Sequence, residues 1–386
     1  MTTSPRPDTL RGVTITGTGM YVPERILTNH DLAQLVDTSD EWIVERTGIR
    51  ERHIAAPDQA SSDLALIACQ RALAMAKVDA KDVDQLILAT TTPDRILPSC
   101  ACTLQKKLGA TKAAAFDMFA ACTGFVFGMG LARGLIGGRM ADTVLVVGVE
   151  TLSRIVDYKD RNTCVLFGDG AGAAVFQACD NGLGIHGVDM HSDGELGEVL
   201  EVPAGISRNP ASERTVGARE HFIRMQGKKL FPFAVRSMED ATRKCCDRAG
   251  WSSGDVDVFV PHQANLRIID GVRERLGLAP EKVYVNIDRY GNTSSASIPV
   301  ALDELVRAGR VKPGSKVAFA AFGGGATWGA STMTWTAPVP EPAETAAIVG
   351  LDEGQVRSQL SYARRRLRIE LGETSGLAAR AGRRGE

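Results

Sequence analysis

Cys122 is the residue of this sequence whose surroundings best suit covalent chemistry. It stands in the segment FAACTGF, directly after the apolar run Ala114–Met118 and at the start of a stretch of small, helix-compatible residues. At a helix N-terminus, unpaired backbone N–H groups and the positive end of the helix dipole favour the thiolate, the reactive form of cysteine. We therefore interpret Cys122 as a nucleophile. The alternative is a small buried hydrophobic residue, as free cysteines often are.

Two further polar residues stand at positions that could meet Cys122. His262, in VPHQANLR, follows a strand pattern, and Asn292, in GNTSSASIP, precedes a helix pattern. Ligands of open α/β sheets gather at the carboxyl ends of strands, so the three side chains could converge on one pocket. A Cys, His, Asn set resembles that of papain-type proteases in residue type, but the surrounding sequence does not. A histidine after a strand can also be purely structural.

The elements that must position these residues alternate between strand and helix patterns, which indicates an α/β fold. Short apolar runs of the kind that form buried parallel strands occur at Val13–Ile15, Gln85–Ala89, Ala114–Met118, Thr143–Val147, Ala173–Phe176, Val256–Val260, Lys282–Val285 and Lys316–Ala320. The clearest helix patterns lie at Ser61–Ala76, with Ser62 as the expected N-cap, and at Pro232–Ala249 and Ala301–Ala308.

The pattern also hints at a duplication. A strand, a polar or reactive residue and a helix start of small residues occur in that order at Cys122 and again at Asn292. Each half ends in a glycine-dense strand segment, GDGAGAAVF at 168–176 and FGGGATWGA at 322–330. We expect two similar lobes that divide within 180–187.

The bulk composition gives no sign of a nucleic-acid or membrane partner. The formal net charge is −1 and the sequence pI is about 6.6. The N-terminus is polar, and no apolar run approaches the roughly 20 residues that cross a bilayer. Eight cysteines are ordinary usage for a reducing compartment. We therefore expect a cytoplasmic protein.

No metal site is expected from the cysteines and histidines. Cys100 and Cys102 form a CxC pair and Cys245 and Cys246 are adjacent, but neither pair has a second half at metal-ligand spacing. The segment from His186 to His191 could hold a metal in principle. We interpret the stretch HSDGELGE, residues 191–198, as a polar surface turn instead.

Six segments together resemble the β-ketoacyl-[acyl-carrier-protein] synthase III family, over roughly residues 11 to 336. These segments are TSDEWIVERTGIRERHI (38–54), AACTGF (120–125), LFGDGAGAAVF (166–176), VPHQANLRII (260–269), GNTSSASIP (291–299) and AFGGGATWG (321–329). The resemblance implies a thiolase-like fold of two similar lobes in a layered α-β-α-β-α arrangement. The lobes would be residues 1–183 and 184–337, followed by an extension at 338–386. It also implies a homodimer.

The resemblance assigns roles to the three polar residues. Cys122 would accept an acyl group from acyl-CoA, and His262 and Asn292 would hydrogen-bond the thioester of malonyl-[acyl-carrier protein] as it decarboxylates. The backbone N–H groups of Cys122 and Gly324 would form a second oxyanion hole, and Phe322 would lie near the thiol. The implied reaction is a decarboxylative Claisen condensation that starts fatty-acid synthesis and needs no cofactor. The runner-up is the same chemistry in a polyketide or other specialised pathway.

Substrate contacts are implied in the same way. Trp42 and Arg161 match the pair that sandwiches the CoA adenine, and Arg46 matches a nearby anion contact; indole and guanidinium planes suit stacking on a purine. Asn265 and Arg267 match the pantetheine tunnel and its mouth. The positive stretch formed by Arg267, Arg273 and Arg275 would dock an acidic carrier protein; a solvated helix face is the alternative.

Three departures from the family bear on the choice of acyl primer. Leu97, in RILPS, stands where the family caps the partner subunit's acyl pocket, and some relatives carry a bulkier aromatic there. Pro232 stands where some relatives have a lysine used in carrier docking, and Ala326 follows the triple glycine where a larger residue is frequent. These departures leave open whether the enzyme uses a longer or branched acyl primer.

The chain changes character at Ala337, where Pro338, Pro340 and Pro342 make a stiff linker. Residues 344–371 resemble the latter part of a sigma-factor region 4 helix-turn-helix, with Gly350 in the turn and the second helix at 355–368. A loosely docked basic helix is the preferred interpretation, ahead of DNA binding. Two further alternatives, acyl transfer without decarboxylation and a non-enzymatic regulator acting through the tail, conflict with the complete Cys, His, Asn set.

Overall fold

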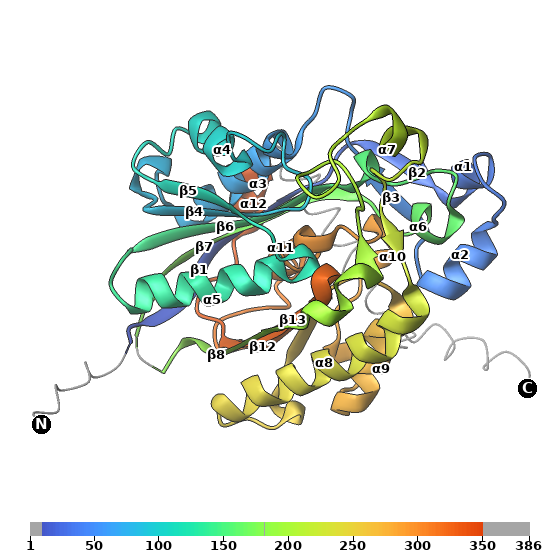
Figure 1. The fold of residues 1–386 in the computed structure, drawn as a ribbon. Coiled ribbons are helices and arrows are strands. Elements are labelled where there is room, and N and C mark those ends of the chain that lie inside the picture. Colours follow the sequence, from blue (N-terminus) through green and yellow to red (C-terminus); the bar gives the residue numbers. More distant parts are fainter. Residues whose placement is uncertain (1–9, 181, 350–386) are drawn as a thin grey trace, which may run out of the picture.

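The structure is a computed structural model that describes residues 10–180 and 182–349. Two mixed β-sheets form its centre (Figure 1). The five-stranded sheet has the order β1 (Gly12–Tyr21), β7 (Asp169–Cys179), β6 (Thr143–Thr151), β4 (Gln85–Ala89), β5 (Ala114–Met118). The four-stranded sheet has the order β11 (Val258–Pro261), β12 (Lys316–Gly323), β13 (Thr327–Thr334), β8 (Gly184–Ser192).

Helices cover both sheets and fill the space between them. On the outer face of the five-stranded sheet lie α3 (Ser61–Ala76) and α4 (Cys100–Leu108). Between the sheets lie α5 (Gly124–Gly137) and α11 (Ser297–Arg307), which share one apolar core with strands of both sheets. On the outer face of the four-stranded sheet lie α8 (Gly227–Arg248) and α9 (Leu266–Leu276). This order confirms the predicted layered α-β-α-β-α arrangement.

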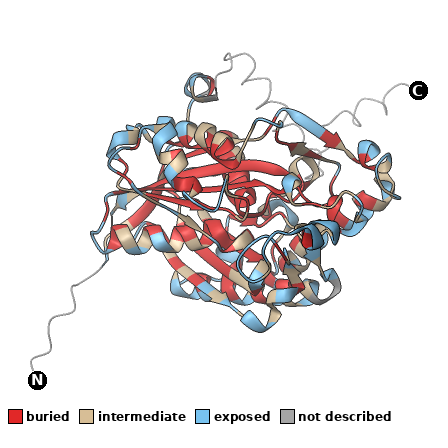
Figure 2. Cartoon of the chain, turned by 45° about the horizontal axis from the view of Figure 1, so that its top comes forward, coloured by how far each residue is buried: buried red, intermediate tan, exposed pale blue. Residues whose placement is uncertain are grey.

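The two central helices are the reason the layers hold together. Helix α5 is apolar on nearly all sides, and α11 buries ten of its eleven residues, as expected for helices with a sheet on each side. Figure 2 shows the buried residues concentrated on the strands and central helices and the exposed ones on the outer helices. Cys122 and Asn292 lie shortly before these two helices, each next to or within the 3₁₀ turn that leads into its helix, and both are buried.

The two sheets share a topology, which supports the predicted duplication. In the first, β4 and β6 are parallel while β7 and β1 follow antiparallel; in the second, β11 and β12 are parallel while β13 and β8 follow antiparallel. Strand β7 ends at Cys179 and β8 begins in the other sheet at Gly184. We propose that the lobes divide there, near residue 183.

A smaller region of short elements lies beside the sheets at the right of Figure 1. It contains β2 (Arg25–Thr28), α1 (Asn29–Ala33), α2 (Asp40–Thr47), β3 (Glu51–Ile54), α6 (Arg161–Cys164), α7 (Glu213–Gly217), β9 (Leu200–Glu201), β10 (Arg224–Met225) and α10 (Ile287–Tyr290). A separate apolar cluster holds most of it together. The last described helix, α12 (Pro342–Val349), lies against α3 and pairs Glu344 with Lys77 at 3.4 Å.

Several local predictions were wrong. Ser62 is not the N-cap of α3, because the helix already begins at Ser61 and the Ser62 hydroxyl donates to Asp94 at 2.6 Å. Helix α8 begins at Gly227, five residues before the predicted start, and continues through Pro232. Helix α11 begins four residues before the predicted Ala301.

One prediction about a strand was also wrong, and a predicted turn was right. The segment 282–285 makes only an isolated bridge from Val283 to Phe259, because Pro280 starts a 3₁₀ turn that ends at Lys282. The polar turn predicted for HSDGELGE at 191–198 is present as a 3₁₀ turn at 194–199, and strand β8 before it ends at Ser192. Within the described ranges, no group of three or more His, Cys, Asp or Glu side chains is placed to hold a metal.

The sigma-factor resemblance falls on Gly350 and 355–368, which lie outside the described residues. In the part of the chain that is described, no helix is long and apolar enough to span a membrane.

Candidate active site

Cys122 lies in a 3₁₀ turn, η2 (Ala121–Thr123), that joins β5 to α5. Its side chain is 7% exposed. Ala121 has a φ of 46°, a left-handed conformation that non-glycine residues rarely adopt. Gly323, at the end of β12, lies against the cysteine so closely that a Cβ there would be 2.6 Å from the Cys122 backbone nitrogen. Cys122 therefore lies on a strained turn that follows β5 of one sheet and packs against the end of β12 of the other.

The surroundings of Cys122 favour a thiol in the resting protein. Burial raises the pKa of the thiol to about 11, although hydrogen bonds from Ser294 and from the backbone N–H groups of Cys122 and Gly324 lower it. The expectation that the helix start favours the thiolate is therefore only partly met, because desolvation outweighs it. The same two N–H groups are the predicted second oxyanion hole, and the structure places both at the sulfur.

His262 is the first residue after β11, and its backbone N–H donates to the carbonyl of Ala320 at 2.8 Å. Its Nδ1 lies 2.7 Å from the Ser297 hydroxyl, which also accepts from the Gln263 backbone at 3.3 Å. Since the Ser297 oxygen already accepts from Gln263, we assign its hydroxyl as the donor to Nδ1, which places the ring proton on Nε2. Nε2 is buried and has no hydrogen-bond partner within residues 10–180 and 182–349. Burial lowers the pKa of His262 to about 3, so the ring is neutral.

Asn292 is held in place by backbone pairing with the segment before β7. Its N–H donates to Leu166 at 2.8 Å and its carbonyl accepts from Gly168 at 3.0 Å. Its side-chain Oδ1 accepts the Ser294 backbone N–H at 2.8 Å. The amide oxygen is therefore engaged, whereas the NH₂ group makes no hydrogen bond to a described residue.

Two serines connect the three predicted residues. Ser294 contacts Cys122 with its side chain and Asn292 with its backbone, while Ser297, one turn later, binds His262. The structure thus brings Cys122, His262 and Asn292 around one short segment, 294–297. Sequence reasoning missed both serines and also Glu150, a buried acid beside this segment. The dense run of hydroxyl residues after Asn292 was the available signal.

The two predicted wall residues lie in different places. Phe322 is buried near the end of β12, two residues before Gly324, and packs edge-on against Phe233 at 5.6 Å between ring centroids. Leu97 is 85% exposed on the loop before α4, so it does not line the buried site of its own chain.

The predicted CoA contacts form a cluster on the surface. The guanidinium carbons of Arg46 and Arg161 lie 4.9 Å and 5.1 Å from the centroid of the half-buried Trp42 indole. Arg46 reaches the ring from one turn later on α2, and Arg161 reaches it from α6. Asn265 ties α9 to this cluster, since its Nδ2 donates to the Arg46 carbonyl at 3.0 Å.

The predicted docking arginines on α9 are not equivalent. Arg273 is bound to Asp270 at 3.3 Å and Glu274 at 3.1 Å, and Arg275 pairs with Glu239. Arg267 is exposed and makes no ion pair with any described residue. Of the three, Arg267 is the positive charge most available to a partner.

Comparisons with known proteins identify the family of this chain. Residues 116–194 match the family model described as 3-oxoacyl-[acyl-carrier-protein (ACP)] synthase III, and residues 246–335 match the model of its C-terminal part. The β-ketoacyl-[acyl-carrier-protein] synthase III of Symbiobacterium thermophilum is 54% identical over 326 residues, which are 84% of this chain and 99% of the relative.

Solved structures give the same result. The 3-oxoacyl-[acyl-carrier-protein] synthase III of Aquifex aeolicus superposes with a TM-score of 0.78 at 44% identity, over 84% of this chain and 100% of that one. The priming β-ketosynthase of the R1128 polyketide pathway gives 0.80 at 35% identity, over 87% and 100%. The thiolase-like fold is thereby confirmed, and the chain belongs to the β-ketoacyl-[acyl-carrier-protein] synthase III family.

Proposed function

We propose that this enzyme joins an acyl group from acyl-CoA to a malonyl-[acyl-carrier protein] through an acyl-cysteine at Cys122. The observation that carries the proposal is the convergence of Cys122, His262 and Asn292 around residues 294–297. The product is a 3-oxoacyl-[acyl-carrier protein], the first condensation product of fatty-acid synthesis. Covalent catalysis divides one difficult transfer into two easier ones.

In the first half-reaction, the Cys122 sulfur attacks the thioester carbonyl of acyl-CoA. The carbonyl oxygen becomes an oxyanion, which the backbone N–H groups of Cys122 and Gly324 are placed to stabilise. The carbon–sulfur bond to CoA then breaks, and CoA leaves with that electron pair. Phe322 forms part of the apolar surroundings of the acyl group.

In the second half-reaction, malonyl thioester loses CO₂ and becomes an enolate. The His262 Nε2–H and the Asn292 NH₂ donate to the enolate oxygen, since neither makes a hydrogen bond to a described residue. The enolate carbon attacks the acyl-cysteine and releases Cys122. Since CO₂ loss itself supplies the carbanion, the reaction as written needs no cofactor.

The Trp42 cluster suits the adenine end of CoA. Arg46 and Arg161 already lie against the indole ring, so a purine could replace one guanidinium as a stacking partner while the charges bind phosphate. Asn265 and Arg267, which begin α9 beside this cluster, mark the path of the pantetheine arm. An acidic carrier protein would dock on this face of α9, with Arg267 as the main contact and Arg273 and Arg275 as weaker ones.

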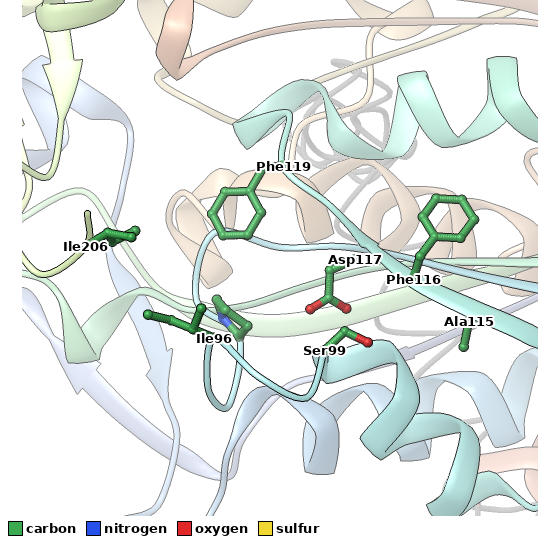
Figure 3. Close-up of a pocket in the computed structure, with 8 residues that line it drawn as sticks. Ile96, Ser99, Ala115, Phe116, Asp117, Phe119 and Ile206 are labelled. Atoms are coloured by element: carbon green, nitrogen blue, oxygen red, sulfur yellow. The ribbon is translucent and has the colours of Figure 1, made fainter. Parts of the chain in front are cut away.

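The homodimer is proposed from the edge of the five-stranded sheet. Strand β5 pairs with β4 on one side and has no partner on its other edge among the described strands. An apolar pocket of about 480 Å³ lies beside this edge, lined by Ile96, Phe116, Phe119, Ile206 and their neighbours (Figure 3). Open edges and exposed apolar patches mark association sites. A second copy pairing here would also bring its Leu97 to this face. Phe116→Lys should yield a monomer in analytical ultracentrifugation.

The identity of the acyl primer would distinguish an enzyme of fatty-acid synthesis from one of a specialised pathway. Leu97, smaller than an aromatic residue, leaves room for a longer or branched acyl group if it caps the partner's pocket. We assign the enzyme to the cytoplasm, where acyl-CoA and carrier protein occur.

The proposal is tested by mixing the enzyme with malonyl-[acyl-carrier protein] and a panel of acyl-CoA esters. Mass spectrometry should detect a 3-oxoacyl-[acyl-carrier protein], and release of CO₂ without any condensed product would contradict the assignment.

A further inference from the structure

Glu150 is an acid buried near the end of β6, and no described lysine or arginine lies beside it. Its side chain is fully buried, and no lysine or arginine within the described ranges forms an ion pair with it. Hydroxyl and backbone groups surround it instead: Oε2 accepts from the Thr92 and Thr91 hydroxyls at 2.8 and 3.0 Å, and from the Thr91 N–H at 3.1 Å. A carboxyl in such surroundings can exchange a proton without breaking an ion pair.

The other side of the carboxyl faces the active site. Oε1 lies 3.2 Å from the Ser295 hydroxyl, which is itself 2.9 Å from the carbonyl of Ala89. The Ser294 side chain lies beside both the Glu150 carboxyl and the Cys122 thiol, close enough to lower the pKa of each. Ser294 therefore joins the acid to the nucleophile, and its strained φ of 48° holds it there.

Acyl transfer requires a destination for the Cys122 proton. Burial raises the pKa of that thiol to about 11, so little thiolate exists near neutrality. His262 is a poor acceptor, because burial lowers its pKa to about 3. Burial also raises the pKa of Glu150, which makes its carboxylate a better base than an exposed one.

We propose that Glu150 takes up the Cys122 proton through Ser294 during acyl transfer and gives it back when the condensed product leaves. The Cys122 proton passes to the Ser294 oxygen while the Ser294 proton passes to the carboxylate, and the sulfur electron pair forms the new thioester bond. Condensation later expels Cys122 as a thiolate, which recovers the stored proton by the same route. Because Glu150 acts through Ser294, it is a positioning residue rather than a catalytic one. The inference rests on the proposed function.

The only ionisable group among the described residues named around the Glu150 carboxyl is the Cys122 thiol. Cys122 faces Glu150 from η2, and the charge of each disfavours ionisation of the other. The other groups around Glu150 are uncharged hydroxyls. Thr90, Thr91 and Thr92 supply three of them from the segment after β4, and Ser294 and Ser295 supply two from the 3₁₀ turn η7 (Ser294–Ala296). The acylation rate should accordingly fall as the pH drops through the raised pKa of Glu150.

The test compares Glu150→Gln with wild type in single-turnover acylation by acetyl-CoA, followed by intact-protein mass from pH 5 to 10. We expect Glu150→Gln to slow acylation about 10²-fold near pH 7. The variant should also lose the acidic limb and gain rate about tenfold per pH unit toward the pKa of Cys122. Condensation started from pre-acylated enzyme reports the other half-reaction. An equal slowing of both half-reactions with an unchanged pH profile would show that Glu150 is merely structural.

Two serine variants serve as matched controls and cover the case in which Glu150→Gln does not fold. Ser294→Ala breaks the relay and should reproduce the altered pH profile. Ser295→Ala removes a neighbouring hydroxyl from the carboxyl but leaves the relay intact, so it should keep the acidic limb. If Ser294→Ala retains the wild-type limb, the proposal is overturned. Failure of the wild type itself to acquire an acyl group would instead refute the proposed function.

Discussion

The same local device occurs in both halves of the molecule and serves opposite ends of the reaction. At 121–124 a left-handed residue, Ala121, and a 3₁₀ turn lead into α5; at 292–297 a left-handed residue, Ser294, and a 3₁₀ turn lead into α11. The first presents a nucleophile, whereas the second presents an amide donor and the serines that hold the other two groups. We propose that a duplication supplied these two equivalent positions and that the side chains placed there divide the chemistry.

Burial affects the two halves in the same direction but with different consequences. It raises the pKa of Cys122 and lowers that of His262, so both groups are neutral at rest. A neutral cysteine must lose its proton before it reacts. A neutral imidazole with a free Nε2–H is already suited to donate to an enolate. The C-terminal half is therefore ready to act, and the N-terminal half must be activated.

The largest effect should come from the nucleophile itself. Cys122→Ala should reduce condensation by at least about 10⁴-fold, because both half-reactions pass through the sulfur. Steady-state formation of 3-oxoacyl-[acyl-carrier protein] measures the loss. Residual turnover within tenfold of wild type would mean that the acyl group takes another route.

The equivalent position in the second half should affect one half-reaction alone. Asn292→Ala should slow CO₂ release from malonyl-[acyl-carrier protein] by about 10²- to 10³-fold through loss of one donor. Acylation of Cys122 should stay within a few-fold of wild type, as measured by quenched-flow mass spectrometry. Comparable damage to both half-reactions would indicate that the two turns do not divide the work.

His262 should make the stability of the fold depend on pH. Its pKa is about 3 in the folded protein and near 6.5 when unfolded, so its stabilising effect is complete above pH 6.5 and is lost as the pH falls. At pH 4.5 the loss should reach about 3 kcal/mol relative to neutral pH. Urea unfolding of wild type and His262→Gln at both pH values isolates this contribution. An equal pH dependence in the two proteins would exclude it.

The smallest of the four effects concerns binding far from the sulfur. Trp42→Ala should raise the KM for acyl-CoA about tenfold, the amount expected from losing one stacking partner. The KM for malonyl-[acyl-carrier protein] should change much less, because a carrier-bound substrate has no adenine. Trp42→Phe is the matched control and should retain part of the affinity.

The layers and the three central residues were predictable because their signals are local or carried by a family motif. Buried parallel strands such as β4 and β6 appear as continuous apolar runs, and the glycines that approach other backbone closely, such as Gly323, stand within recognisable motifs. The three-residue site then followed from the resemblance.

What escaped prediction depends on contacts between distant segments. The bounds of α3 were predicted correctly, but its N-cap was misassigned, because the Ser62 hydroxyl donates to Asp94, 32 residues away. The thiol state of Cys122 depends on burial from both sheets, which outweighs the helix start. Glu150 was not identified, because its importance comes from meeting Ser294 and Ser295 across the two halves. The three arginines predicted to dock a carrier protein also differ in a way that the sequence did not show. Arg273 and Arg275 pair with acidic residues, whereas Arg267 has no ion pair with a described residue.

The most direct test of the account is the intact mass of the protein after incubation with a panel of acyl-CoA esters, with Cys122→Ala alongside. The account predicts a gain of one acyl group in wild type and none in the variant, and the ester that loads best identifies the primer. An acyl adduct that persists in Cys122→Ala, or no adduct from any ester, would contradict the assignment of Cys122 as the acyl acceptor from CoA.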